Sequence, residues 1–133
     1  MERVIRVVAA VVEREGKYLI TQRRDEAVLG GLWEFPGGKV EPGESDEHAL
    51  GRELLERLGV AAEVKAKLTE HDHLYEGYRV HLTLYACELP EGAEPHAENV
   101  KDLRWVASSE FASYPFPPAD QRSMDLLLGL RRN

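Results

Sequence analysis

The chain has 133 residues, 43 % apolar and 31 % charged, so it can form one folded domain with a core, which excludes a disordered segment. Its formal net charge of -7, from 17 basic and 24 acidic residues, argues against a protein that binds a nucleic acid polymer. No signal-peptide pattern is present, and no apolar run approaches the roughly 20 residues of a membrane span, so we expect a cytoplasmic protein without a membrane partner.

The first third of the chain predicts short strands separated by turns. An apolar, β-branched run over residues 4–12 predicts a buried strand. A turn signal at 15–16 and a second apolar run over 17–22 predict that these two strands form a hairpin. Residues 32–35 predict a brief third strand, whereas the Pro-Gly-Gly run at 36–38 is expected to interrupt regular structure.

A helix over residues 45–58 is the clearest predicted element. Ser45 is its expected N-cap, and Gly59 is its expected end because glycine tolerates the left-handed conformation that follows many helices. At about 100° per residue, three leucines fall on one side of the helix and should face the core: Leu50, Leu54 and Leu58.

The second half of the chain predicts further strands and one more helix. Strands are expected over 60–69, 79–89 and 103–106, followed by a helical turn over 109–112 and a last helix over 119–131. Strands combined with two helices in one short chain predict an α/β fold, a sandwich with a mixed sheet. We expect a single domain that covers residues 1–133.

Charged residues gather on the side of the predicted helix that faces away from the leucines. Glu53 and Glu56 are three residues apart, so their carboxylates should be neighbours. Adjacent carboxylates repel each other unless a cation lies between them, and Mg²⁺ prefers such hard oxygen ligands. The alternative is a solvated surface with two ion pairs at i,i+4 spacing, Arg52–Glu56 and Glu53–Arg57.

Residues 38–60 read GKVEPGESDEHALGRELLERLGV. This segment resembles the Nudix box, G-x5-E-x7-R-E-U-x-E-E-x-G-U, in which U is aliphatic. The positions that match are Gly38, Glu44, Arg52, Glu53, Leu54, Glu56, Gly59 and Val60. One position departs, because Arg57 stands where the box usually has the second glutamate of its Glu-Glu pair. Three further segments are similar to the MutT-like branch of the same family: LITQRR at 19–24, LWEFPGGK at 32–39 and YPFPPAD at 114–120.

The resemblance implies a Nudix-type α/β/α sandwich and a catalytic site that uses Mg²⁺, or Mn²⁺ in its place. Four residues would hold the metal: Gly38 through its backbone, Glu53, Glu56 and Glu98. Arg52 would orient Glu53 by an ion pair, and Glu44 would support the loop or a second metal. Two candidates for the general base stay open, Glu53 and Glu98. Arg57 accepts no hydrogen bond and cannot hold metal, so it would pair with Glu53 or contact substrate phosphate.

The resemblance also implies substrate contacts. Arg23 would reach the substrate phosphates, and Lys39 is either a second phosphate contact or an exposed turn lysine. Phe35 either stacks on a nucleobase or packs in the core. Asp120 either contacts the base edge or caps the last helix.

The activity implied by the resemblance is hydrolysis of a nucleoside triphosphate, in particular an oxidised or modified one, to monophosphate and pyrophosphate. Such an enzyme would clean the nucleotide pool, with the nucleotide as its only expected partner and a monomeric or homodimeric state. One alternative is hydrolysis of a nucleoside-diphosphate sugar or dinucleotide. Another is a domain that binds nucleotide without turnover, which Arg57 motivates.

Overall fold

A computed structural model describes residues 3–131, so residues 1–2 and 132–133 of the expected domain lie outside the described part of the chain. The strands are β1 (Val4–Val11), β2 (Glu13–Arg14), β3 (Lys17–Gln22), β4 (Trp33–Glu34), β5 (Gly37–Lys39), β6 (Glu63–Tyr75), β7 (Tyr78–Glu88) and β8 (Asp102–Val106). The helices are α1 (Asp46–Leu58), the 3-10 helix η1 (Ser108–Ser113) and α2 (Pro118–Arg131). Within the described residues, no helix combines the length and the apolar character that a membrane crossing requires.

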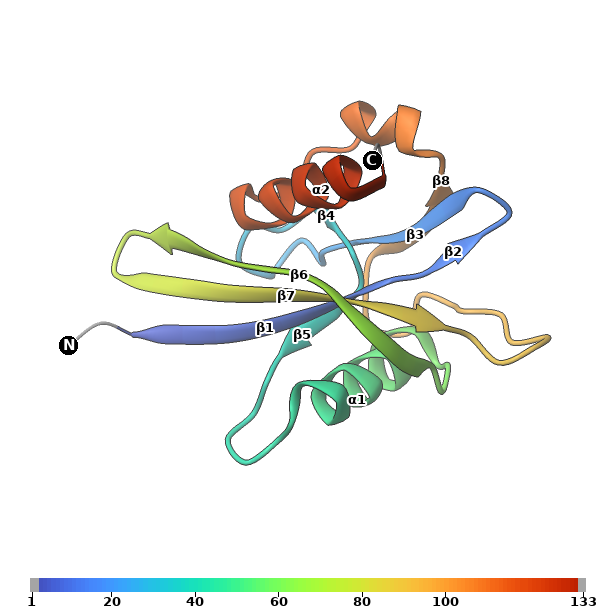
Figure 1. Ribbon diagram of the computed structural model, residues 1–133, viewed down its shortest axis with the longest axis horizontal. Coiled ribbons are helices and arrows are strands. Elements are labelled where there is room, and N and C mark those ends of the chain that lie inside the picture. Colours follow the sequence, from blue (N-terminus) through green and yellow to red (C-terminus); the bar gives the residue numbers. More distant parts are fainter. Residues whose placement is uncertain (1–2, 132–133) are drawn as a thin grey trace.

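The strands form two four-stranded sheets, and the one with the longer strands, called the larger sheet below, is mixed. Its strand order is β5-β1-β7-β6, with β1 parallel to β7 and both outer pairs antiparallel. The second sheet has the order β2-β3-β4, and β8 pairs with β3. Helix α1 lies on one side of the larger sheet and α2 on the other (Figure 1). The predicted α/β class with a mixed sheet is therefore confirmed.

The predicted hairpin forms, but not between the strands expected. β2 and β3 pair around Glu15 and Gly16, whose φ angles of 51° and 76° are typical of a two-residue hairpin turn. β1 instead enters the larger sheet, parallel to β7. The prediction that residues 4–12 pair with 17–22 was therefore wrong for β1. In the second half of β1, Val8 and Ala10 pack in one core cluster and Ala9 and Val11 in the other, so both faces are covered there and the sequence is continuously apolar.

The segment expected to interrupt regular structure is in fact a strand. In β5, Gly38 pairs with Val8 and Gly37 pairs with Ala9 of β1. A Cβ on Gly37 would lie 2.0 Å from the Val8 carbonyl oxygen, so only glycine allows the two backbones to approach this closely. The predicted break is confirmed at Pro36, which lies between β4 and β5. It was wrong for residues 37–38, because the two glycines serve close approach here rather than a turn.

β6 continues well beyond the predicted end near residue 69 and reaches Tyr75. It is an edge strand, paired only with β7 in the larger sheet. Polar side chains are tolerated at a sheet edge, and exposure alternates along residues 70–75 as it does in a strand. The sequence prediction ended too early because this half of β6 lacks apolar alternation.

Helix α1 follows the prediction closely. The Ser45 hydroxyl accepts a hydrogen bond from the His48 amide at 3.1 Å, and Gly59 ends the helix in the left-handed conformation with φ 69°. The three leucines expected in the core are fully buried: Leu50, Leu54 and Leu58. They pack in one cluster with Val8 and Ala10 of β1. The helix is thereby fixed against the sheet beside β5.

Candidate active site

Glu53 is a buried carboxylate at the centre of the candidate site. Its side chain reaches β5 at Gly38, where a Cβ would lie 2.2 Å from the Glu53 carboxyl carbon. Arg52 Nη1 donates to Glu53 Oε1 at 3.0 Å, and Arg57 Nε donates to Glu53 Oε2 at 2.7 Å. The expectation that Glu53 lies on the solvent side of the helix was wrong, since it is only 7 % exposed. Because Gly38 has no Cβ, the Glu53 carboxylate can fill the space beside it.

Arg52 is fixed in turn by the loop before α1. Its Nε and Nη2 donate to the two oxygens of Glu44 at 2.8 Å each, and Nη2 also donates to the Lys39 carbonyl at 3.1 Å. The Arg52 hydrogen bonds, followed by that of the Glu41 amide, lower the pKa of Glu44 to about 2. The hydrogen bond to Glu44 likewise raises the pKa of Arg52. These contacts suit the roles expected of both residues, which are to orient Glu53 and to support the loop.

Glu56 lies three residues further along α1, and its side chain is 54 % exposed. Its carboxylate lies 3.5 Å from Arg52 Nη1, the nitrogen that also contacts Glu53, so both acids face one guanidinium. Both ion pairs considered from the sequence, Arg52–Glu56 and Glu53–Arg57, are therefore present.

These residues fit a hard divalent cation. Mg²⁺ takes one or two protein carboxylates and completes its shell with water and substrate phosphate. Glu53 and Glu56 supply that number of carboxylates from one helix, and the space left by Gly38 holds the first of them beside the β5 backbone.

Glu98 lies apart from this pair. It is exposed, in the loop that packs on the C-terminal end of α1, where its amide donates to the Arg57 carbonyl at 3.0 Å. Among residues 3–131, no three His, Cys, Asp or Glu side chains gather as metal ligands, so Glu98 is not brought together with Glu53 and Glu56. The metal and base roles expected of Glu98 stay predictions.

A cavity of about 550 Å³ opens beside Glu53 and extends to the beginning of α2. That volume is typical of a small-molecule site. At one end it is lined by Gly38, Lys39, Glu53 and Arg57. The exposed Lys39 side chain lies at this end, where it could contact a phosphate as a point charge.

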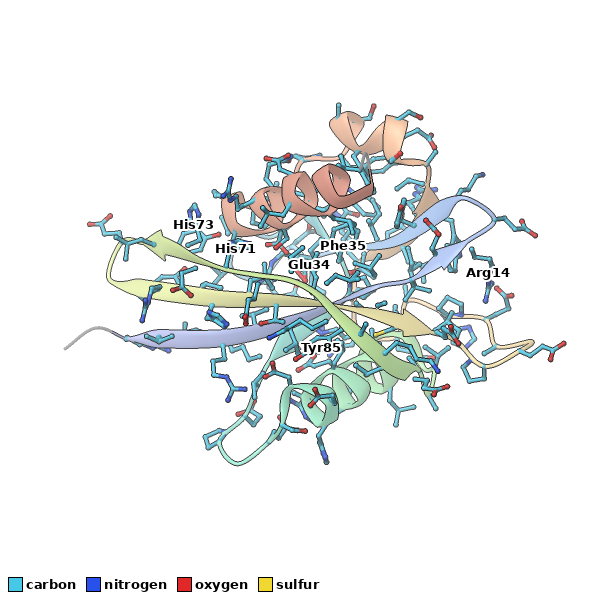
Figure 2. All side chains as sticks on the ribbon, in the orientation of Figure 1. Arg14, Glu34, Phe35, His71, His73 and Tyr85 are labelled. Carbon is cyan, nitrogen blue, oxygen red and sulfur yellow. The ribbon has the colours of Figure 1, made fainter. Side chains whose placement is uncertain are left out.

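Two acids and an arginine line the other end of the cavity. Glu34, which is 8 % exposed, accepts a hydrogen bond from Arg23 Nη1 at 2.7 Å and lies between α2 and the strands (Figure 2). Arg23, expected at the substrate phosphates, is therefore placed with Glu34 rather than beside Glu53. Burial, followed by the charge of Glu34, raises the pKa of Asp120 to about 8. Because α2 begins at Pro118, the alternative that Asp120 caps this helix was wrong.

Aromatic side chains cover two parts of the cavity wall. Phe35 is 1 % exposed and packs edge-to-face against Phe111 and Phe116, with ring centroids 6.0 Å and 5.9 Å apart. These contacts favour core packing over the stacking role considered for Phe35, although it also lines the cavity. Tyr75 and Tyr78 stack on each other with centroids 5.2 Å apart and line the cavity from the β6–β7 turn.

Three of these lining residues were missed by sequence reasoning: Glu34, Tyr75 and Tyr78. Glu34 lies inside the LWEFPGGK segment, so the resemblance itself was the available signal. The two tyrosines flank a Glu-Gly turn whose glycine has φ 86°. Aromatic residues on either side of such a turn are typical of a hairpin, so the sequence held a signal for the β6–β7 turn and its two tyrosines.

Fold and site together define a protein with an arginine-held acid pair at the edge of a mixed sheet, beside a cavity large enough for a small molecule. A family model described as NUDIX domain matches residues 7–126. The chain therefore belongs to the Nudix hydrolase family.

Individual relatives and structures agree with this membership. The chain is 40 % identical over 130 residues to the CTP pyrophosphohydrolase of Escherichia coli (strain K12), covering 97 % of this chain and 95 % of that protein. It is 36 % identical over 126 residues to the putative 8-oxo-dGTP diphosphatase 2 of Mycobacterium tuberculosis (strain ATCC 25618 / H37Rv), covering 86 % and 82 %. The solution structure of the E. coli ORF135 protein matches with a TM-score of 0.83 and 39 % identity, covering 98 % of this chain and 92 % of that one.

Proposed function

We propose that this protein is a Mg²⁺-dependent pyrophosphohydrolase that converts a nucleoside triphosphate to its monophosphate and pyrophosphate. The observation that carries the proposal is the buried Glu53 carboxylate, held by two arginines at the end of a nucleotide-sized cavity. The relatives named for CTP and for 8-oxo-dGTP support a triphosphate substrate, including oxidised or modified bases.

The chemistry needs charge neutralisation and an activated water more than a covalent intermediate. A water oxygen bonds to phosphorus, the P–O bond to the bridging oxygen breaks, and the water proton passes to a base. Bound Mg²⁺ would neutralise phosphate charge and acidify that water, with Glu53 and Glu56 as its protein ligands and Gly38 beside it. Of the two candidate bases, Glu53 lines the cavity whereas Glu98 lies outside it, so we propose Glu53.

The other end of the cavity would bind the base. With its raised pKa, Asp120 is mostly protonated at pH 7 and can donate a hydrogen bond. Glu34, ion-paired with Arg23, can accept one. A donor and an acceptor side by side suit a base edge that carries an exocyclic amino group next to an acceptor, as in cytosine. The function would be the removal of oxidised or modified nucleotides from the nucleotide pool.

Further expectations accompany this proposal. The enzyme would be cytoplasmic, a single domain, and a monomer or homodimer, with no nucleic acid polymer as partner. Size-exclusion chromatography with light scattering would determine the oligomeric state.

A substrate panel tests the proposal. Pyrophosphate release would be measured with Mg²⁺ and CTP, dCTP, 8-oxo-dGTP, a nucleoside-diphosphate sugar and a dinucleotide, each scored by kcat/KM. We expect a triphosphate to give the highest value. Reaction in ¹⁸O-labelled water would then show which product carries the new oxygen. Binding of nucleotides without turnover of any of them would contradict the proposal.

A further inference from the structure

Arg57 is the one position at which residues 38–60 depart from the Nudix box, and it lies within the candidate active site. Its Nε donates to Glu53 Oε2 at 2.7 Å from one helical turn away, and its side chain lines the cavity. In the motif this position is usually an acid, so the cationic side chain changes the charge next to Glu53 by two units. Arg57 therefore bears directly on how this particular site takes up a cation.

The two arginines that hold Glu53 are anchored very differently. Arg52 makes hydrogen bonds to both oxygens of Glu44 and to the Lys39 carbonyl as well as to Glu53. Among the described residues, the Arg57 side chain makes its hydrogen bond to Glu53 alone. Arg57 can therefore move away from Glu53 by breaking one hydrogen bond, whereas a similar movement of Arg52 would also break its hydrogen bonds to Glu44 and Lys39.

A divalent cation and Arg57 compete for the same carboxylate oxygen. A cation that binds Glu53 Oε2 at the position where Arg57 Nε now donates would displace Arg57, and the displaced guanidinium would then repel the new charge from within the cavity. If the cation arrives with a phosphate chain, Arg57 gains a new acceptor, and guanidinium pairs well with phosphate. Because Arg57 exchanges the Glu53 oxygen for a phosphate oxygen, most of the cost of breaking its hydrogen bond and of bringing the cation near its charge is removed.

We propose that Arg57 couples cation binding to nucleotide binding: it holds Glu53 until a phosphate chain arrives and then transfers to that chain. This inference rests on the proposed function, since it assumes that the cavity binds nucleotide phosphates next to Glu53. Its consequence is that the protein binds a free divalent cation weakly and takes up cation and nucleotide together. The coupling is reciprocal, so each ligand raises the affinity for the other by the same factor.

Binding measurements on the intact protein test this inference without relying on turnover. Mn²⁺ alone would be titrated against wild type, Arg57→Gln and Arg57→Lys, with free Mn²⁺ followed by electron paramagnetic resonance. Binding of a non-hydrolysable CTP analogue would be measured by calorimetry with and without saturating Mn²⁺. Arg104→Gln is the matched control, because Arg104 is an exposed arginine of β8 whose ion pair is with Asp102 and which does not line the cavity.

We expect Arg57→Gln to bind Mn²⁺ alone about tenfold more tightly than wild type, and the coupling factor between Mn²⁺ and the analogue to fall by a similar ratio. Arg57→Lys should retain part of the coupling because the positive charge remains, and Arg104→Gln should match wild type. Equal coupling in wild type and Arg57→Gln would overturn the inference while leaving the proposed function standing. If no variant bound the analogue with or without Mn²⁺, the proposed function would fail, and the inference with it.

Discussion

The two ends of the cavity are built in different ways. The phosphate end comes from β5, the following loop and α1, a continuous stretch of residues 37–58. The base end combines Glu34 of β4, Arg23, Asp120 of α2 and two tyrosines at the β6–β7 turn, which lie far apart in the sequence. The first end is a local motif, and the second exists only once the chain has folded.

This difference also appears in the electrostatics. At the phosphate end, the Glu44 carboxylate is charged over almost the whole pH range because Arg52 lowers its pKa. At the base end, burial keeps Asp120 mostly neutral at pH 7. The phosphate end therefore holds paired charges, whereas the Asp120 carboxyl at the base end can gain or lose a proton near physiological pH.

Removal of a carboxylate from the phosphate end should have the largest effect. We expect Glu56→Gln to lower kcat by about 10²-fold or more, since one cation ligand would be lost where charge develops in the transition state. Because the Glu56 side chain is exposed, the midpoint of thermal unfolding of the variant should stay close to that of wild type. Glu47→Gln, an exposed acid at the start of the same helix, is the control and should keep wild-type rates. Near-normal activity in Glu56→Gln would remove it from the metal site.

A methyl group at residue 38 should disturb the same end through packing. In Gly38→Ala the new Cβ would lie 2.2 Å from the Glu53 carboxyl carbon, so the carboxylate must move. We expect kcat to fall by at least about tenfold, because small displacements of a positioned group reduce rates strongly. Gly51→Ala is the matched control, with no atom within 4 Å of its Cβ. It should raise the free energy of unfolding by about 0.8–1.0 kcal/mol and leave kcat unchanged.

At the base end, the effect should depend on pH. As pH rises through about 8, Asp120 loses its proton and its ability to donate, so KM for a cytidine triphosphate should increase, by about tenfold at pH 9. Asp120→Asn cannot ionise and should flatten this profile. Asp125→Asn, on the exposed side of the same helix, should keep the wild-type profile. A KM profile that is the same in Asp120→Asn and wild type would argue against a role for this proton in base binding.

The smallest effect concerns stability in acid. The pKa of Glu44 is about 2 in the folded protein and ordinarily 4.5, so its contribution to stability is present above pH 4.5 and disappears as pH falls through about 2. We expect Glu44→Gln to be less stable than wild type at pH 6 and to lose less stability between pH 5 and 2. Urea unfolding at each pH measures this. An equal loss in both proteins would mean that the ion pair with Arg52 does not contribute.

Much of the phosphate end could be predicted because its determinants are local. Ser45, Gly59 and the three buried leucines define α1 through capping and helical periodicity. The motif then places Glu53 and Arg52 on that helix. The burial of Glu53 could not be predicted, since it depends on Gly38 lying in a strand against the helix.

Three later elements, β7, β8 and α2, lie where the sequence predicted them. The strand pairing and the base end escaped prediction because they depend on partners distant in sequence. β1 lies between β5 and β7 rather than beside β3, because both of its faces are covered in the larger sheet; hydrophobic periodicity shows that a strand is buried but not which strands it pairs with. Glu34 lies in a short strand, and its role depends on its ion pair with Arg23 and on the nearby Asp120, neither of which is close to it in the sequence. The base end thus required the three-dimensional arrangement of three separate segments.

The central claim is that the acids of α1 hold a divalent cation against a phosphate chain. Anomalous scattering from Mn²⁺, in crystals grown with a non-hydrolysable CTP analogue, tests it most directly. We predict a Mn²⁺ peak bound by the Glu53 and Glu56 carboxylates and by the analogue's phosphates, with the cytosine beside Asp120. A well-ordered analogue bound elsewhere, with Glu53 still paired to Arg52 and Arg57 and no Mn²⁺ peak beside it, would contradict the account.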